Sequence, residues 1–161
     1  MSRDTASDKL EIFLDGSSRG NPGPAGCGVV IRDADGMVLL EEGYSLGKMT
    51  NNAAEYNALI IALGEALILK ARSVKVHADS ELLVRQMNGQ YRVRNEGLKV
   101  LHGRASRLTR GFEEFGIVHV PREENREADR LAQQAGRDGV KAAKSRNVQS
   151  DRRGHSKGSL F

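Results

Sequence analysis

The chain has 161 residues, of which 39% are hydrophobic and 29% charged, and this balance predicts one globular domain with a substantial core. The longest apolar segment, residues 57–71, is interrupted by Gly64 and Glu65, so we expect no membrane span. The N-terminus lacks the apolar core of a secretory signal, which favours a cytoplasmic protein. The single cysteine, Cys27, lies among glycines and is interpreted as a small buried filler rather than a nucleophile.

The net charge of +4 comes from the C-terminal end of the chain. Residues 140–161 carry +5, which leaves −1 for the other 139 residues, so a generally basic body that binds nucleic acid is not supported. This segment is rich in serine, glycine and charge, and we expect a disordered tail that either holds phosphates or only improves solubility. Its basic residues are Lys141, Lys144, Arg146, Arg152, Arg153 and Lys157.

Apolar periodicity predicts, in chain order, three strands, a helix, a strand, two helices, a strand and a last helix. Hairpins followed by strands that are joined through helices predict an α/β fold, with a mixed sheet between helices. Asp35 and Gly36 mark the turn of the second hairpin, and Gly136 and Gly139 are expected to end the last helix. The expected strands are residues 9–15, 26–33, 37–45, 73–79 and 115–120, and the expected helices are residues 52–71, 80–87, 95–111 and 124–136.

Four carboxylates lie at the edges of the apolar faces of these elements: Asp15, Glu55, Asp79 and Asp129. Each also has an ordinary structural explanation. These are an Asp-Gly turn for Asp15, a capping box begun by Asn52 for Glu55, a helix cap for Asp79 and a surface ion pair with Arg126 for Asp129.

The separate explanations do not account for the common placement of the four carboxylates. Asp15 and Asp79 belong to strands of one sheet, and Glu55 begins the apolar stripe of a helix, where an unpaired charge is costly to bury. A cluster of like charges needs cations. Oxygen ligands without cysteine or histidine suit Mg²⁺ or Mn²⁺.

Four sequence blocks, in this order, resemble ribonuclease HI: "DGSSRGNPGPAG", "TNNAAEYNAL", "ADSELLVRQMNG" and "VPREENREADRLA". The similarity covers residues 9–137. It implies the ribonuclease H-like fold, a five-stranded mixed sheet of order 3-2-1-4-5 in which the first and fourth strands are neighbours. The domain organisation would then be a flexible N-terminus (1–8), a ribonuclease H domain (9–139) and the basic tail (140–161).

The resemblance also implies an activity, endonucleolytic cleavage of the RNA strand of an RNA–DNA hybrid to 3′-hydroxyl and 5′-phosphate ends. Asp15, Glu55, Asp79 and Asp129 would be the catalytic residues and the ligands of two Mg²⁺ ions, with Mn²⁺ as a possible substitute. In the family's arrangement Asp15 bridges the ions, Asp79 and Asp129 hold the ion of the attacking water and its neighbour, and Glu55 completes the shell.

Contacts with the hybrid are implied for the loop after Asp15 and for the start of the first helix. Short polar side chains at a helix N-terminus suit phosphates and 2′-hydroxyls, which distinguish RNA from DNA. We expect a monomer that reads shape rather than sequence. The expected substrate-binding residues are Gly16, Ser17, Asn21, Thr50, Asn51, Asn52, Arg94 and Asn95, of which the last two could equally lie in a solvated loop.

The chain departs from the family pattern in three places. The loop "VPREENREAD" holds no histidine, and His119, Arg122 or Glu124 could only partly replace one, so slower turnover is expected. The basic protrusion of some members is absent, because "NGQYRVRNEG" is too short for it. Glu81 stands where many members have glutamine.

Two alternatives remain open at this point. The chain could be a hybrid-binding module that lost efficient turnover with the histidine, although binding alone would not need four carboxylates. It could also be another nuclease or a recombinase of the same fold that acts on DNA, because a fold by itself does not fix the substrate.

Overall fold

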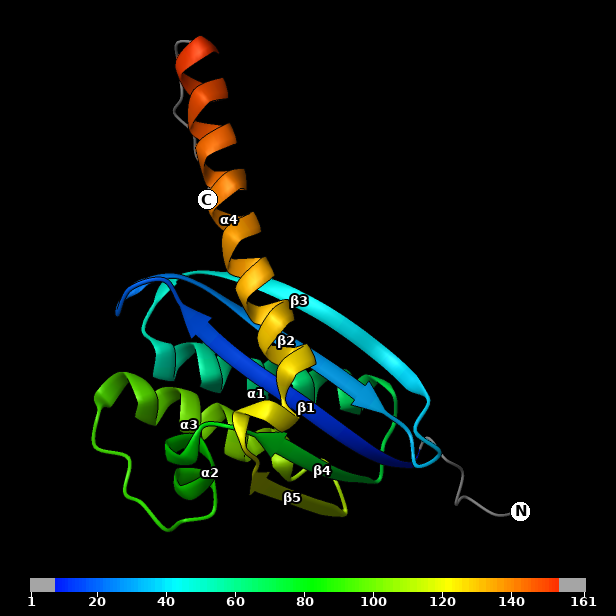
Figure 1. The fold of residues 1–161 in the computed structure, drawn as a ribbon. Helices are drawn as coiled ribbons and strands as arrows, with labels where there is room; N and C mark the ends of the chain where they lie inside the picture. Colours follow the sequence, from blue (N-terminus) through cyan, green and yellow to red (C-terminus); the bar gives the residue numbers. More distant parts are fainter. Residues whose placement is uncertain (1–7, 154–161) are drawn as a thin grey trace.

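Five strands form one mixed sheet with helices on both faces (Figure 1). The structure is a computed structural model that describes residues 8–153, so nearly all of the predicted flexible N-terminus lies outside it. The elements are β1 (Lys9–Ser18), β2 (Gly23–Arg32), β3 (Val38–Met49), α1 (Asn51–Ile68), β4 (Ser73–Ala78), α2 (Glu81–Met87), α3 (Glu96–Thr109), β5 (Glu114–His119), a short 3-10 turn (Arg122–Glu124) and α4 (Arg126–Arg153).

The strand order β3-β2-β1-β4-β5 confirms the order that the resemblance implies. The first three strands are antiparallel, whereas β4 runs parallel to both β1 and β5. In the register of β1 and β4, Leu14 lies opposite Ala78. Asp15 directly follows Leu14 in β1, and Asp79 directly follows Ala78 at the end of β4, so the backbones of the two carboxylates are neighbours.

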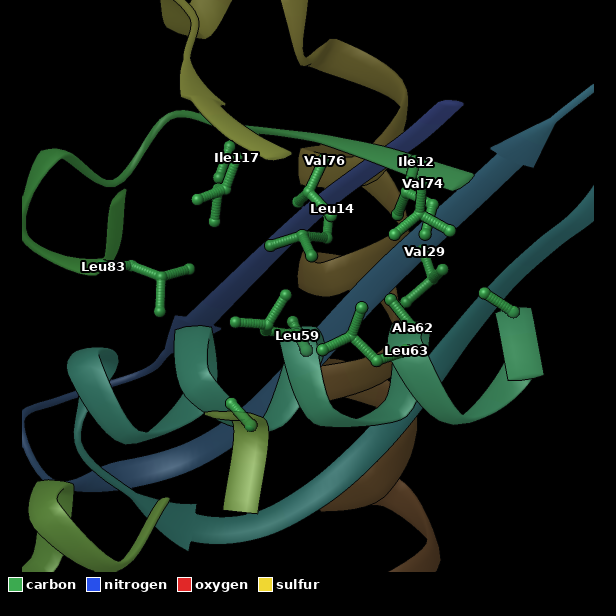
Figure 2. Close-up of a cluster of buried hydrophobic side chains, with 14 of the residues drawn as sticks. Ile12, Leu14, Val29, Leu59, Ala62, Leu63, Val74, Val76, Leu83 and Ile117 are labelled. Carbon is green, nitrogen blue, oxygen red and sulfur yellow. The ribbon is translucent and has the colours of Figure 1, made fainter. Parts of the chain in front are cut away.

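Helix α1 covers one face of the sheet with an apolar stripe (Figure 2). The predicted inward face of β1 is confirmed, since Leu10, Ile12 and Leu14 are all buried. Cys27 is fully buried in β2, and burial raises the pKa of its thiol to about 12. The interpretation of Cys27 as a filler is therefore confirmed, because a protonated, enclosed thiol is a poor nucleophile.

Helix α4 crosses the opposite face, where glycines let its backbone touch the sheet (Figure 1). A Cβ atom added to Gly28 would lie 2.2 Å from the carbonyl oxygen of Ala128. One added to Gly26 would lie 2.4 Å from the carbonyl oxygen of Ala132. Because Gly26 and Gly28 have no side chains, the backbone of α4 packs directly on β2. This close packing determines how near Asp129 of α4 lies to β1.

The predicted end of the last helix is wrong, because α4 continues through Gly136 and Gly139 to Arg153. A Cβ atom added to Gly139 would lie 3.0 Å from Oγ of Ser45, and that hydroxyl donates to the carbonyl of Ala135 at 2.6 Å. Gly139 therefore serves close packing on β3, and neither glycine ends the helix. Residues 140–153 are helical rather than irregular, and residues 154–161 of the predicted tail lie outside the described residues.

We predict that Gly28→Ala lowers the free energy of unfolding by about 1–3 kcal/mol, because the new methyl group would force α4 away from β2. The matched control is Gly64→Ala in α1, where an added Cβ meets nothing within 4 Å. Alanine there should stabilise the helix by about 0.5–1 kcal/mol. Urea unfolding of both variants checks this, and equal effects would contradict the packing argument.

Candidate active site

Three carboxylates from three different elements meet at the end of β1. Asp15 lies within β1, Glu55 in the second turn of α1, and Asp79 directly after β4. One oxygen atom from each lies within 4.8 Å of the others. Asp15 and Glu55 are 5% and 9% exposed, so this is a largely buried cluster and not a solvated acidic surface.

Gly16 allows α1 to come close enough for Glu55 to join this cluster. A Cβ atom added to Gly16 would lie 2.3 Å from the carbonyl carbon of Ala54, so only glycine leaves room there. The backbone N–H of Gly16 donates to Oε1 of Glu55 at 3.1 Å. Backbone contact between β1 and α1 therefore fixes the carboxylate of Glu55 beside that of Asp15.

Helix capping does not explain Glu55 or Asp79. The residue that caps α1 is Thr50, whose hydroxyl accepts from the N–H of Ala53, so the expected capping box from Asn52 to Glu55 is wrong. The cap of α2 is Ser80, whose hydroxyl accepts from the N–H of Leu83. Both carboxylates are thereby left free of a capping role.

Asp129 lies beside this cluster but outside its tightest part. Its carboxyl lies close enough to that of Asp15 to raise the pKa of Asp15, and its side chain is 21% exposed. It also accepts from Gln133 Nε2 at 3.2 Å and contacts Arg122 Nη2 at 3.5 Å. The ion pair within the described residues is with Arg122, so the expected pair with Arg126 is wrong.

The electrostatics of the cluster oppose ionisation. Burial raises the pKa of Asp15 well above its usual range, with further upward contributions from Glu55, a hydrogen bond to Asp129, and Asp79. Burial is also the main cause that raises the pKa of Glu55, followed by repulsion from Asp79, while hydrogen bonds from Asp15 and Gly16 oppose the rise. Without a cation the cluster therefore retains protons.

Two of the predicted substrate residues near the cluster, Asn21 and Asn51, are joined with Ser18 by backbone-to-side-chain hydrogen bonds, and we call these three residues the frame around Asn51. The N–H of Ser18 donates to Oδ1 of Asn51 at 2.7 Å, and the N–H of Asn51 donates to Oδ1 of Asn21 at 3.0 Å. These bonds join the end of β1, the loop before β2 and the start of α1. An open groove beside them is lined in part by Ser17, Asn51, Arg122 and Arg137.

The remaining predicted substrate residues are less closely grouped. Thr50 and Asn52 flank Asn51 at the start of α1, and Asn52 is exposed. Arg94 is exposed, and Asn95 caps α3 through a bond from the N–H of Leu98. Among the described residues, no hydrogen bond joins Arg94 or Asn95 to the frame around Asn51.

At each position where the chain departs from the family pattern, the structure gives the exposure or the contacts of the residue. His119 is exposed at the last position of β5. Glu81 accepts from Nε of Arg85 at 2.9 Å, and the guanidinium of Arg85 lies 5.3 Å from the ring centre of Tyr91. Of the residues considered as replacements for histidine, Arg122 is the one that contacts a carboxylate of the site.

Sequence reasoning missed Asn125, which is 2% exposed and donates to Asp79 Oδ2 at 3.2 Å. The available signal was a polar residue four positions before Asp129, where the last helix begins.

In the part of the chain that the structure describes, no helix is both long and apolar enough to cross a membrane.

Comparison with known proteins gives one consistent result. A protein-family model described as "reverse transcriptase-like" matches residues 13–135. The chain is 40% identical over 127 residues to a protein named ribonuclease HI from Halobacterium salinarum, covering 79% of this chain and 64% of that protein. It is 44% identical over 128 residues to a bifunctional protein of Mycobacterium tuberculosis, covering 79% of this chain and 35% of that protein. The chain thus spans less than two thirds of the length of either relative.

Solved structures agree with this result. The N-terminal RNase H domain of the Mycobacterium tuberculosis protein superposes with a TM-score of 0.80 at 43% identity, covering 84% of this chain and 98% of that one. A structure of LC11-RNase H1 in complex with an RNA/DNA hybrid superposes with a TM-score of 0.77 at 40% identity, covering 81% and 99% of the two chains.

We predict that Asp15→Asn stabilises the metal-free protein at pH 8. The pKa of Asp15 and that of Glu55 are both raised on folding, the latter to about 8, so the folded state binds more protons than the unfolded state. Stability must then fall as the pH rises from about 4 to about 8. At pH 8 Asp15 ionises freely in the unfolded chain but not in the folded chain, which favours unfolding. The amide removes this difference, and we expect the free energy of unfolding at pH 8 to rise by more than about 1 kcal/mol, since one pKa unit corresponds to about 1.4 kcal/mol.

Urea unfolding in the presence of a chelator, at pH 5 and at pH 8, checks this prediction. The two proteins should differ less at pH 5 than at pH 8. A difference that does not depend on pH would show that the raised pKa of Asp15 is not its cause.

Proposed function

Because the chain belongs to the ribonuclease H family, we propose that it hydrolyses the RNA strand of RNA–DNA hybrids, leaving 3′-hydroxyl and 5′-phosphate ends. The observation that carries this proposal is the convergence of Asp15, Glu55 and Asp79 within 4.8 Å, with Asp129 beside them. A buried cluster of this kind is unfavourable by itself, and divalent cations would compensate its charge.

The donor set fits hard divalent cations, because it consists of carboxylate oxygens only. We propose that these four carboxylates would hold two Mg²⁺ ions, with Mn²⁺ as a substitute, and that Asp15 would serve both ions because it interacts electrostatically with each of the other three carboxylates. When bound, such ions lower the pKa of a water and stabilise charge on a leaving oxygen. Asp79 and Asp129 would hold the ion on the side of the attacking water, and Glu55 would complete the shell and face the RNA.

The frame around Asn51 supports the choice of substrate. Its bonds to Ser18 and Asn21 hold polar side chains and a helix N-terminus beside the carboxylates, and such groups suit phosphates and 2′-hydroxyls. LC11-RNase H1, which binds an RNA/DNA hybrid, has the same fold. We propose that Gly16, Ser17, Asn21 and residues 50–52 contact the RNA strand, and that Arg94 and Asn95 contact the DNA strand.

Two further properties follow from the same site. All four carboxylates come from one chain, so we propose that the monomer is active. The loop before α4 supplies Arg122 and no histidine, and an arginine does not exchange protons near neutral pH. Turnover should therefore be slow rather than absent.

The decisive experiment is cleavage of a labelled RNA–DNA hybrid, with duplex DNA and duplex RNA as controls, in Mg²⁺ and then in Mn²⁺. We expect cuts in the RNA strand of the hybrid, with 3′-hydroxyl ends, and a fall of cutting to background in Asp15→Asn and Asp79→Asn. Asn88→Ala, which removes an amide bonded to the carbonyl of Ile117, is the control for a substitution away from the cluster. If the hybrid is bound but not cut in either metal, the chain is a hybrid-binding module instead.

The basic C-terminal segment gives a separate prediction. Deletion of residues 140–161 removes six basic residues and only one acidic residue, Asp151. If this segment binds the hybrid, its deletion should weaken the salt dependence of binding by about 0.7–0.9 in log–log slope for each phosphate that the segment neutralises. Binding titrations at several salt concentrations measure this slope, and an unchanged slope would assign the segment no role in binding.

A further inference from the structure

Asn125 is a buried amide that contacts several parts of the site at once. It stands directly before α4 and is 2% exposed. Its Nδ2 donates to the carbonyl oxygen of Leu14 at 2.9 Å and to Oδ2 of Asp79 at 3.2 Å. Its backbone carbonyl accepts from the N–H of Asp129 at 3.1 Å.

The orientation of this amide is set by its two acceptors. Both N–H groups of Nδ2 face oxygen atoms, so the flipped amide would direct Oδ1 at a carbonyl and a carboxylate and would be repelled. In the observed orientation, Oδ1 is buried without a hydrogen-bond partner among the described residues. An unsatisfied buried acceptor costs free energy, so the two donated bonds outweigh that cost.

Helix capping does not explain Asn125 either. An asparagine directly before a helix ordinarily caps it, with its side-chain oxygen accepting from an N–H of the first turn. The Oδ1 atom of Asn125 accepts no such bond within the described part of the chain. The side chain has turned toward β1 and Asp79 instead.

The contacts of Asn125 reach three of the four carboxylates. Leu14 directly precedes Asp15 in β1, Asp79 is bonded to the amide itself, and Asp129 is anchored through its backbone N–H. One side chain thus joins β1, the end of β4 and the start of α4. The strands and helices fix the backbones of these residues, and the amide of Asn125 fixes in addition the side chain of Asp79 relative to the backbone beside Asp15.

We propose that Asn125 is a positioning residue that holds Asp79, and through the backbone Asp15 and Asp129, in the arrangement that receives divalent cations. This inference rests on the proposed function for its link to catalysis. Residues that orient metal ligands through a hydrogen bond typically contribute about 10–100-fold in metal affinity. Asn125 contacts ligands and backbone, and it needs no contact with the substrate.

The test compares Asn125→Ala with Asn88→Ala by calorimetric titration of the folded proteins with Mn²⁺ alone. Asn88 is a matched control, because its Nδ2 donates to a strand carbonyl, that of Ile117, at 3.2 Å, and it is not among the carboxylates' contacts. We expect Asn125→Ala to bind Mn²⁺ about tenfold or more weakly, and Asn88→Ala to retain its affinity within about twofold. On the hybrid, kcat should fall in Asn125→Ala with little change in KM.

A purely structural role for Asn125 would give a different result. It predicts a lower melting temperature for Asn125→Ala with Mn²⁺ affinity equal to that of the unmodified chain, and this outcome, or an equal decrease of affinity in Asn88→Ala, would overturn the proposal. If Asn125→Ala does not fold, Asn125→Ser, which keeps one hydroxyl donor, is judged by the same affinity criterion. If the unmodified chain binds Mn²⁺ but cuts no hybrid, the proposed function fails while the affinity comparison still decides the role of Asn125.

Discussion

The repulsion among buried carboxylates is the constraint on which the rest of the structure depends. Asp15 and Glu55 are almost fully enclosed, and Asp79 lies within the same 4.8 Å. Carboxylates left alone in such surroundings would separate or be expelled to water. They remain together because each is carried by an element that is fixed for another reason: β1 and β4 by their parallel pairing and α1 by its apolar stripe (Figure 2).

Close backbone packing brings these elements into contact at the site. Gly16 lets the end of β1 touch the first turns of α1, and Gly26 and Gly28 let α4 lie directly on β2. Hydrogen bonds then fix local positions, as in the bond from Gly16 to Glu55 and the pair of bonds between residues 18, 21 and 51. The hydrophobic core therefore provides the stability, and the glycines provide the proximity.

Much of this could be predicted from the sequence, because it follows from local periodicity and from motifs. Alternation in residues 9–15 correctly identified the buried face of β1, and the Asp-Gly turn at Asp35 is formed as expected, with Gly36 at φ +86°. The strand order, in contrast, came only from the resemblance to ribonuclease HI, since periodicity does not specify which strands are neighbours. The grouping of Asp15 with Asp79 depends on that order and could not be deduced from spacing alone.

The errors share one physical cause, since they concern residues whose role is decided by distant partners. Glycines such as Gly136 and Gly139 often follow the end of a helix, but here the helix continues past both, and Gly139 packs closely against Ser45 of β3. Asn52 and Glu55 match a capping box in sequence, but the residue that caps α1 is Thr50. The carboxylate of Glu55 instead accepts a hydrogen bond from the backbone N–H of Gly16 in β1. Asn125 received no role from the sequence, because its acceptors lie on β1 and after β4, far from it in the chain.

The contact between α4 and the glycines of β2 also bears on which substitutions the carboxylate cluster can tolerate from a distance. Helix α4 lies with its backbone against Gly26 and Gly28, and a Cβ atom added to either residue would lie 2.4 Å or less from a carbonyl oxygen of the helix. A side chain at either position would therefore displace the part of α4 that carries Asp129. These two glycines thus influence the carboxylate cluster although neither belongs to it, and a substitution there is expected to change the position of Asp129 as well as the stability of the fold.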